Sequence, residues 1–151
     1  LRGSDGGAAI DNVVILTGDV HTSWVADITD NPNLPLNQVG GYNPLTGQGS
    51  VATEFVVTSV TSPGLDLPNQ IIQAIRLTSP HIKHVNVTER GYSVLRVAED
   101  KTTCEYWAVS TILERGGSER LSASFEVADG ANRIKPQGLY PVNVVTSLLG
   151  V

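Results

Sequence analysis

The chain contains the run Val13-Val14-Ile15-Leu16-Thr17-Gly18-Asp19-Val20-His21, in which an apolar segment ends in a glycine, a carboxylate and an imidazole. Residues 13–16 are continuous, apolar and mostly β-branched, which predicts a strand covered on both faces. Gly18 ends this strand, because glycine permits a turn or a close approach of the backbone to a ligand. Ligand sites of open α/β sheets lie at the carboxyl ends of strands, so the run predicts a site there.

Asp19 and His21 are the candidate metal ligands of this site. If the backbone stays extended, residues two apart point to the same side, and both side chains face one cavity. A carboxylate oxygen together with an imidazole nitrogen suits Zn, Fe or Mn, whereas carboxylate oxygen alone suits Ca or Mg. The alternative is structural: Asp19 caps a turn through its side chain, and His21 is a surface histidine.

Composition limits the classes of function. A chain of 151 residues is long enough for one domain with its own core. The formal net charge of −5 and the lack of a Lys/Arg cluster argue against nucleic acid or an anionic membrane as partner. No apolar run is long enough to span a bilayer. The single cysteine, Cys104, excludes an internal disulfide and is expected to be a buried, inert thiol.

The order of expected elements is mostly β. We expect strands at residues 25–28, 51–60 and 121–127, and an antiparallel hairpin of residues 92–97 and 103–109 with a five-residue loop. A helix is expected to begin with Asp66 as N-cap and Pro68 in its first turn, and to end at residues 78–80. Residues 29–50 form a long loop, which is either a lid or substrate contact or a tolerated insertion. Glu54 interrupts an apolar strand and should be paired or hydrogen-bonded there.

Several blocks taken together resemble the PhoD-like family of alkaline phosphatases, relatives of the calcineurin-like and purple acid metallophosphoesterases. The blocks are Leu16-Thr17-Gly18-Asp19-Val20-His21-Thr22-Ser23-Trp24, Val51-Ala52-Thr53-Glu54-Phe55, Thr58-Ser59-Val60-Thr61-Ser62-Pro63-Gly64, Pro80-His81-Ile82-Lys83, Arg90-Gly91-Tyr92 and Ser122-Ala123-Ser124-Phe125-Glu126-Val127. The resemblance covers about residues 11–127. It implies an α/β fold, a two-sheet metallophosphoesterase sandwich flanked by helices, of which this chain is the C-terminal, β-rich portion. Residues 1–130 are then the C-terminal part of the catalytic domain, and residues 131–151 are a tail.

The resemblance also implies an activity, the hydrolysis of phosphate mono- or diesters by a metal-activated water within a longer, secreted, periplasmic or cell-surface enzyme. Asp19 and His21 match the family's metal ligands, the metals being Fe and Ca, with other divalent metals open. The remaining ligands, including a cysteine that Cys104 does not match, belong to the N-terminal half of the same enzyme. His81 is a second candidate, for phosphate contact or acid catalysis, against a structural histidine in a Pro-bounded turn. Ser79 stands where the family usually has asparagine.

Other functions fit the same residues. A chain that begins at Leu1, has no methionine and opens on a loop is expected to be part of a longer protein, and by itself to be inactive. One alternative is therefore a non-catalytic β-rich fragment or interaction domain with an incomplete metal site. Another combines Ser59 or Ser62 with His81 and Asp19 as a nucleophile, a base and an acid, although no Gly-x-Ser-x-Gly run is present. His84 is expected to be structural.

Overall fold

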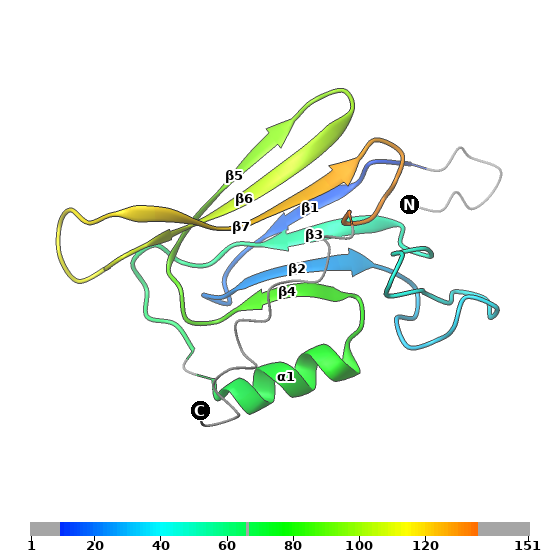
Figure 1. Ribbon diagram of the computed structural model, residues 1–151, viewed down its shortest axis with the longest axis horizontal. Coiled ribbons are helices and arrows are strands. Elements are labelled where there is room, and N and C mark those ends of the chain that lie inside the picture. The colour runs from blue at the N-terminus through cyan, green and yellow to red at the C-terminus, as the bar shows by residue number, and fades with distance from the viewer. Residues whose placement is uncertain (1–9, 66, 136–151) are drawn as a thin grey trace, which may run out of the picture.

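The computed structural model describes residues 10–65 and 67–135, which form two sheets and one helix. The first sheet has the strand order β1-β3-β2-β4, and the second has the order β5-β6-β7 (Figure 1). The strands are β1 (Val14–Thr17), β2 (Ser23–Ile28), β3 (Ala52–Val56), β4 (Ile82–Asn86), β5 (Gly91–Val97), β6 (Lys101–Val109) and β7 (Glu119–Ala128). Helix α1 (Asn69–Thr78) lies beside β4 at the margin of the first sheet. The predicted β-rich, two-sheet architecture is therefore confirmed at this level.

The pairing of the first sheet brings three chain connections to one edge. β1 pairs parallel with β3, whereas β2 is antiparallel to both β3 and β4. The carboxyl ends of β1, β3 and β4 therefore lie at the same edge as the amino end of β2. At this edge Trp24 is opposite Val56, and the Val57 amide donates to the Thr17 carbonyl at 3.0 Å. We call this edge, formed by residues 18–22, 57–64 and 87–90, the His21 edge.

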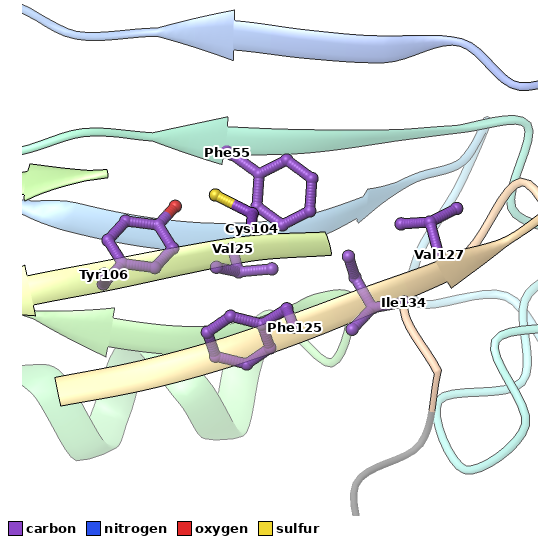
Figure 2. Packing of buried hydrophobic residues seen from close by; sticks show 7 residues of the cluster. All are labelled: Val25, Phe55, Cys104, Tyr106, Phe125, Val127 and Ile134. Carbon is purple, nitrogen blue, oxygen red and sulfur yellow. The ribbon is translucent and has the colours of Figure 1, made fainter. Parts of the chain in front are cut away.

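The core lies between the two sheets and takes side chains from both. Figure 2 shows its members, Val25, Phe55, Cys104, Tyr106, Phe125, Val127 and Ile134. Complete burial of a large apolar side chain stabilises the folded state by about 1.5–3 kcal/mol, so the fully buried Phe55 and Phe125 contribute strongly to stability. The Tyr106 hydroxyl also donates to the Trp24 carbonyl at 3.0 Å and ties the second sheet to the first. Cys104 is fully buried, and burial raises the pKa of its thiol to about 11, which fits the predicted inert cysteine.

β1 differs from the prediction of a strand covered on both faces. Within the described residues it is the outermost strand of the first sheet and pairs only with β3. Val14 packs against the core, but Leu16, on the same face, is 55% exposed. The apolar run correctly predicts a strand, but Val14 and Ile15 are only partly buried and the strand is exposed from Leu16 onward.

The other predicted elements are present with shifted ends, whereas β4 was not predicted as a strand. β5 and β6 form the predicted hairpin, paired as far as Val97 and Thr102, so its turn is shorter than expected. Helix α1 begins at Asn69, with Pro68 at the N-cap position instead of in the first turn. The predicted N-cap, Asp66, lies outside the described residues. The helix ends before Ser79, as the following proline predicts. In the described part of the chain, no helix has the length and apolar character needed to cross a membrane.

A clasp of side-chain amides joins the two ends of the described residues. The Asn12 amide N–H donates to Asn132 Oδ1 at 2.7 Å, and the Gly130 amide donates to Asn12 Oδ1 at 2.7 Å. Asn12 Nδ2 donates to Asp129 Oδ1 at 2.6 Å. Both asparagines have left-handed backbones, φ +59° and +52°, which asparagine adopts more readily than most residues. The predicted boundary at residue 130 stays a prediction, but Ile134 beyond it is a core residue.

Candidate functional site

The turn that carries Asp19 and His21 is tightly bent. The Val20 amide donates to the Gly18 carbonyl at 2.9 Å, which closes a three-residue turn centred on Asp19. Asp19 and His21 have φ of +69° and +54°, so the extended backbone that would align their side chains is not present. Left-handed backbone at residues other than glycine costs about 1–3 kcal/mol and gathers at functional sites. The strain fits a turn shaped for a ligand rather than for stability.

The His21 ring is held by a carbonyl from a distant part of the chain. Its Nδ1 lies 2.9 Å from the Pro63 carbonyl oxygen. Because a carbonyl oxygen can only accept, Nδ1 is the donor in this contact, and in the neutral ring Nε2 then has the lone pair. Metal-binding histidines commonly have this arrangement, in which the second nitrogen donates to a carbonyl or carboxylate. The Thr22 hydroxyl, next along the chain, accepts from Trp24 Nε1 at 2.6 Å.

Asp19 is the second candidate metal ligand at this edge. Its side chain is exposed, and no hydrogen bond or ion pair to another described residue holds the carboxylate. Among the described residues, no group of three His, Cys, Asp or Glu side chains lies close enough together to hold a metal ion. A site normally needs four ligands for Zn and six or more for Ca. The residues present therefore fit two ligands of a metal site and leave the others to be supplied.

Glu54 is not a third candidate metal ligand beside Asp19 and His21. Its Oε1 accepts a hydrogen bond from Thr17 Oγ1 at 2.9 Å, between the paired strands β1 and β3. The predicted hydrogen-bonding role for this carboxylate is consistent with that contact. The Ser59 hydroxyl, the nucleophile of the alternative triad, donates to the Ser62 carbonyl at 2.8 Å.

The opposite end of β2 holds a polar cluster that the sequence analysis missed. The fully buried Asp27 accepts from the Tyr42 hydroxyl at 2.6 Å and from the Ile134 amide at 2.7 Å. Lys83 Nζ lies 3.5 Å from the same carboxylate and donates to the Pro44 carbonyl at 2.8 Å. Burial raises the pKa of Asp27, although these partners favour its charged form. A signal existed in the sequence, since an aspartate inside an apolar strand must find partners.

His81 belongs to the Asp27 end and not to the His21 edge. Its carbonyl accepts from the Asp27 amide at 3.0 Å. Four steps of about 3.3 Å along β2 separate Asp27 from Ser23, so about 13 Å of strand lies between the two ends. Burial, followed by the charge of Lys83, lowers the pKa of His81. The structure places Asp19 and His21 in one turn and His81 at the other end of β2; a catalytic role for His81 stays a prediction.

His84 lies between the two ends of β2 and is packed as a core residue. It is opposite Val25 in the β2–β4 pair, with its ring 5.2 Å from the ring of Phe125 and 6.0 Å from that of Tyr106. Burial lowers its pKa to about 4. These contacts agree with the structural role expected for His84.

These features define a class of protein, a β-rich two-sheet domain with two candidate metal ligands where parallel strands end. The sequence model of the family described as PhoD-like phosphatase matches residues 6–106, and the chain belongs to this family. Alkaline phosphatase D of Bacillus subtilis (strain 168) is 30% identical over 117 residues, which are 77% of this chain and 18% of that protein. The solved structure of PhoD matches with a TM-score of 0.64 at 28% identity, over 83% of this chain and 22% of that one. The chain thus spans about a fifth of the length of these relatives.

Proposed function

We propose that this chain is part of a phosphoesterase that hydrolyses phosphate mono- or diesters with a metal-activated water, and that Asp19 and His21 are two of its metal ligands. Membership of the PhoD-like phosphatase family supports the reaction class. The observation that carries the site is the His21 Nδ1 contact with the Pro63 carbonyl, because in the neutral ring it leaves Nε2 available to bind a metal ion. By resemblance the metals are Fe and Ca, with other divalent metals open.

The roles of the two side chains follow from their geometry. When bound, metal ions at such a site lower the pKa of a water molecule and offset the charge on the phosphoryl oxygens. The Pro63 carbonyl fixes the rotation of the His21 ring and keeps the proton on Nδ1. Asp19 contributes a negative oxygen from a turn whose backbone is already closed, so little backbone freedom is lost on binding.

The proposed setting is a longer enzyme outside the cytoplasm. Its partners would be small phosphate esters and the N-terminal half of the same enzyme. The net charge of −5 disfavours nucleic acid as substrate. The outer edge of β1, without a pairing strand among the described residues, offers backbone groups for the missing part.

A second candidate is a non-catalytic β-rich fragment or interaction domain. It is favoured by the finding that the described residues include no group of three metal-ligating side chains. The two candidates differ in whether donors from outside this chain complete the site.

The test compares this chain with the longest gene product that contains it, by elemental analysis and by hydrolysis of p-nitrophenyl phosphate and its bis ester. We expect metal and activity together in the longer protein, and loss of both in His21→Ala. Asp100→Asn, on the exposed β5–β6 turn, is the control and should keep both. His81→Gln reports on the second candidate residue, since lost turnover with retained metal would give it a catalytic role. Metal absent from the longer protein would overturn the proposal and favour the non-catalytic domain.

A further inference from the structure

Two sequence blocks that carry no assigned chemistry, residues 58–64 and 90–92, fasten to each other at the His21 edge. The Gly91 amide donates to the Ser59 carbonyl at 3.1 Å, and Thr58 Oγ1 donates to the Glu89 carbonyl at 3.2 Å. These bonds dock the connection after β3 against the start of β5. Pro63, whose carbonyl holds His21, lies in that docked connection.

Arg90 binds the peptide group immediately before Pro63. Its Nε donates to the Ser62 carbonyl at 3.2 Å, and its Nη1 donates to the Glu89 carbonyl at 2.8 Å. The Ser59 hydroxyl donates to the same Ser62 carbonyl at 2.8 Å. Two donors from different segments therefore fix the plane of the Ser62–Pro63 peptide.

Gly64 provides the space in which the Arg90 guanidinium lies. A Cβ on Gly64 would lie 1.0 Å from Arg90 Nη2 and 2.0 Å from its Cζ. Any other residue at position 64 would therefore displace the guanidinium. The carbonyl of Pro63 belongs to the peptide group that ends at Gly64, so the guanidinium lies against the residue that follows Pro63 and binds the carbonyl of the residue that precedes it.

We propose that Arg90 and Gly64 are positioning residues that hold the Pro63 carbonyl where it fixes the proton and the orientation of the His21 ring. The proline ring locks φ of Pro63 near −65°, so only its ψ remains to place its carbonyl once the preceding peptide is fixed. The guanidinium against Gly64 restrains that last torsion. The effect on metal affinity rests on the proposed function, whereas the effect on the His21 ring is a property of this chain alone.

The first measurement is the protonation of His21 by long-range ¹H–¹⁵N NMR of the metal-free 151-residue chain at pH 8, with signals assigned through His81→Gln and His84→Gln. In the wild type we expect the proton of His21 on Nδ1. In Arg90→Gln we expect a larger Nε2–H fraction, because the Pro63 carbonyl is no longer held. Gly64→Ala should act in the same way, because the new methyl group displaces the guanidinium without removing it.

The double variant separates one shared interaction from two independent ones. If Arg90 and Gly64 act through the same contact, Gly64→Ala should add little to Arg90→Gln. Arg90→Lys keeps one donor for the Ser62 carbonyl and should restore part of the Nδ1–H signal. Arg96→Gln, in β5, with a side chain that is 60% exposed and paired with Glu105, is the matched control and should leave His21 unchanged.

The second measurement is the affinity of the longest gene product for Zn²⁺ added alone. Loss of a group that orients a metal-binding histidine costs about 10–100-fold in affinity, and we expect a loss in this range for both variants. A His21 proton that stays on Nδ1 in folded Arg90→Gln and Gly64→Ala would overturn the positioning role, as would an equal effect of Arg96→Gln. If Arg90→Gln does not fold, Gly64→Ala decides alone. A moved proton without a change in Zn²⁺ affinity supports positioning and overturns only the metal role of His21.

Discussion

The two ends of β2 carry two aspartates in opposite environments. Asp19, at the His21 edge, is exposed and is held by no described side chain. Asp27 is fully buried, with Tyr42 and the Ile134 amide bonded to its oxygens and Lys83 nearby. The backbone is strained at Asp19, φ +69°, and regular at Asp27, which lies inside the strand. The same side chain is thus available for binding where its oxygens are exposed, and it stabilises the fold where they are buried and hydrogen-bonded.

The contrast also separates the two histidines that the sequence offers as site residues. His21 shares the exposed turn, and its ring is oriented by one carbonyl at 2.9 Å. His81 shares the buried end, where its backbone supports the strand that carries Asp27. The two histidines therefore lie at opposite ends of β2, and only His21 shares its turn with Asp19.

The largest expected effect is that of Asp27→Ala on stability. Removal of this carboxylate leaves the Tyr42 hydroxyl, the Ile134 amide and Lys83 without their shared acceptor. Breaking a buried pair in this way costs about 3–5 kcal/mol. Urea unfolding of the 151-residue chain measures the change, and a loss below about 1 kcal/mol would contradict the structural role of Asp27.

The next largest effect is the acid sensitivity caused by His84 in the middle of the same strand pair. Its folded pKa is about 4, against 6.5 in the unfolded chain, so the unfolded state binds the proton more tightly. Stability is complete above pH 6.5 and falls as the pH drops toward 4, by about 3 kcal/mol from this residue. Unfolding of the wild type and of His84→Gln across this range gives the contribution as a difference; equal slopes would contradict it.

A smaller loss is expected for Tyr42→Phe. The change removes the 2.6 Å hydrogen bond to Asp27 but keeps the ring, which lies 5.1 Å from Lys83 Nζ. A hydrogen bond to a charged group contributes about 1.5–3 kcal/mol, and we expect a loss near 2 kcal/mol because Lys83 and the Ile134 amide remain. Thermal unfolding beside Tyr92→Phe, whose hydroxyl bonds Glu119 at the surface, provides the comparison. An equal loss in both variants would show that burial at Asp27 adds nothing.

The smallest effect on stability is expected for Asp19→Asn. Asparagine tolerates the left-handed backbone, and no described partner loses a bond, so the free energy of unfolding should change by less than about 0.5 kcal/mol. Zn²⁺ affinity of the longest gene product, measured by calorimetry, should nevertheless fall. A large stability loss with unchanged affinity would reverse the contrast between Asp19 and Asp27.

Local patterns predict the elements of this fold well. Alternating and β-branched residues correctly predict the β5–β6 hairpin and β7, and Pro80 correctly predicts the end of α1. The pair Asp19 and His21 is also found in one turn after one strand. Local sequence patterns do not predict which strands are covered by other segments of the chain. β1 is therefore exposed at Leu16 despite its continuous apolar run.

The parts that were missed depend on contacts between distant residues. The Pro63 carbonyl that binds His21 is 42 positions away, and the amide of Ile134 that binds Asp27 is 107 positions away. The left-handed backbone of Asp19 and His21 is likewise set by the surrounding structure, since neither residue type requires it. Sequence spacing can propose the donors of a site, whereas their orientation depends on the folded chain.

The clasp between Asn12 and Asn132 joins the segments near the two ends of the described residues by hydrogen bonds, so that these residues form a non-covalently closed ring. Each asparagine binds the segment that carries the other, so neither segment can peel away while its partner stays in place. Opening from one end must release both, and the hydrogen-exchange protection of β1 and β7 should be lost together rather than in sequence. We therefore expect the segments of Asn12 and Asn132 to unfold cooperatively with each other, although they lie at the surface.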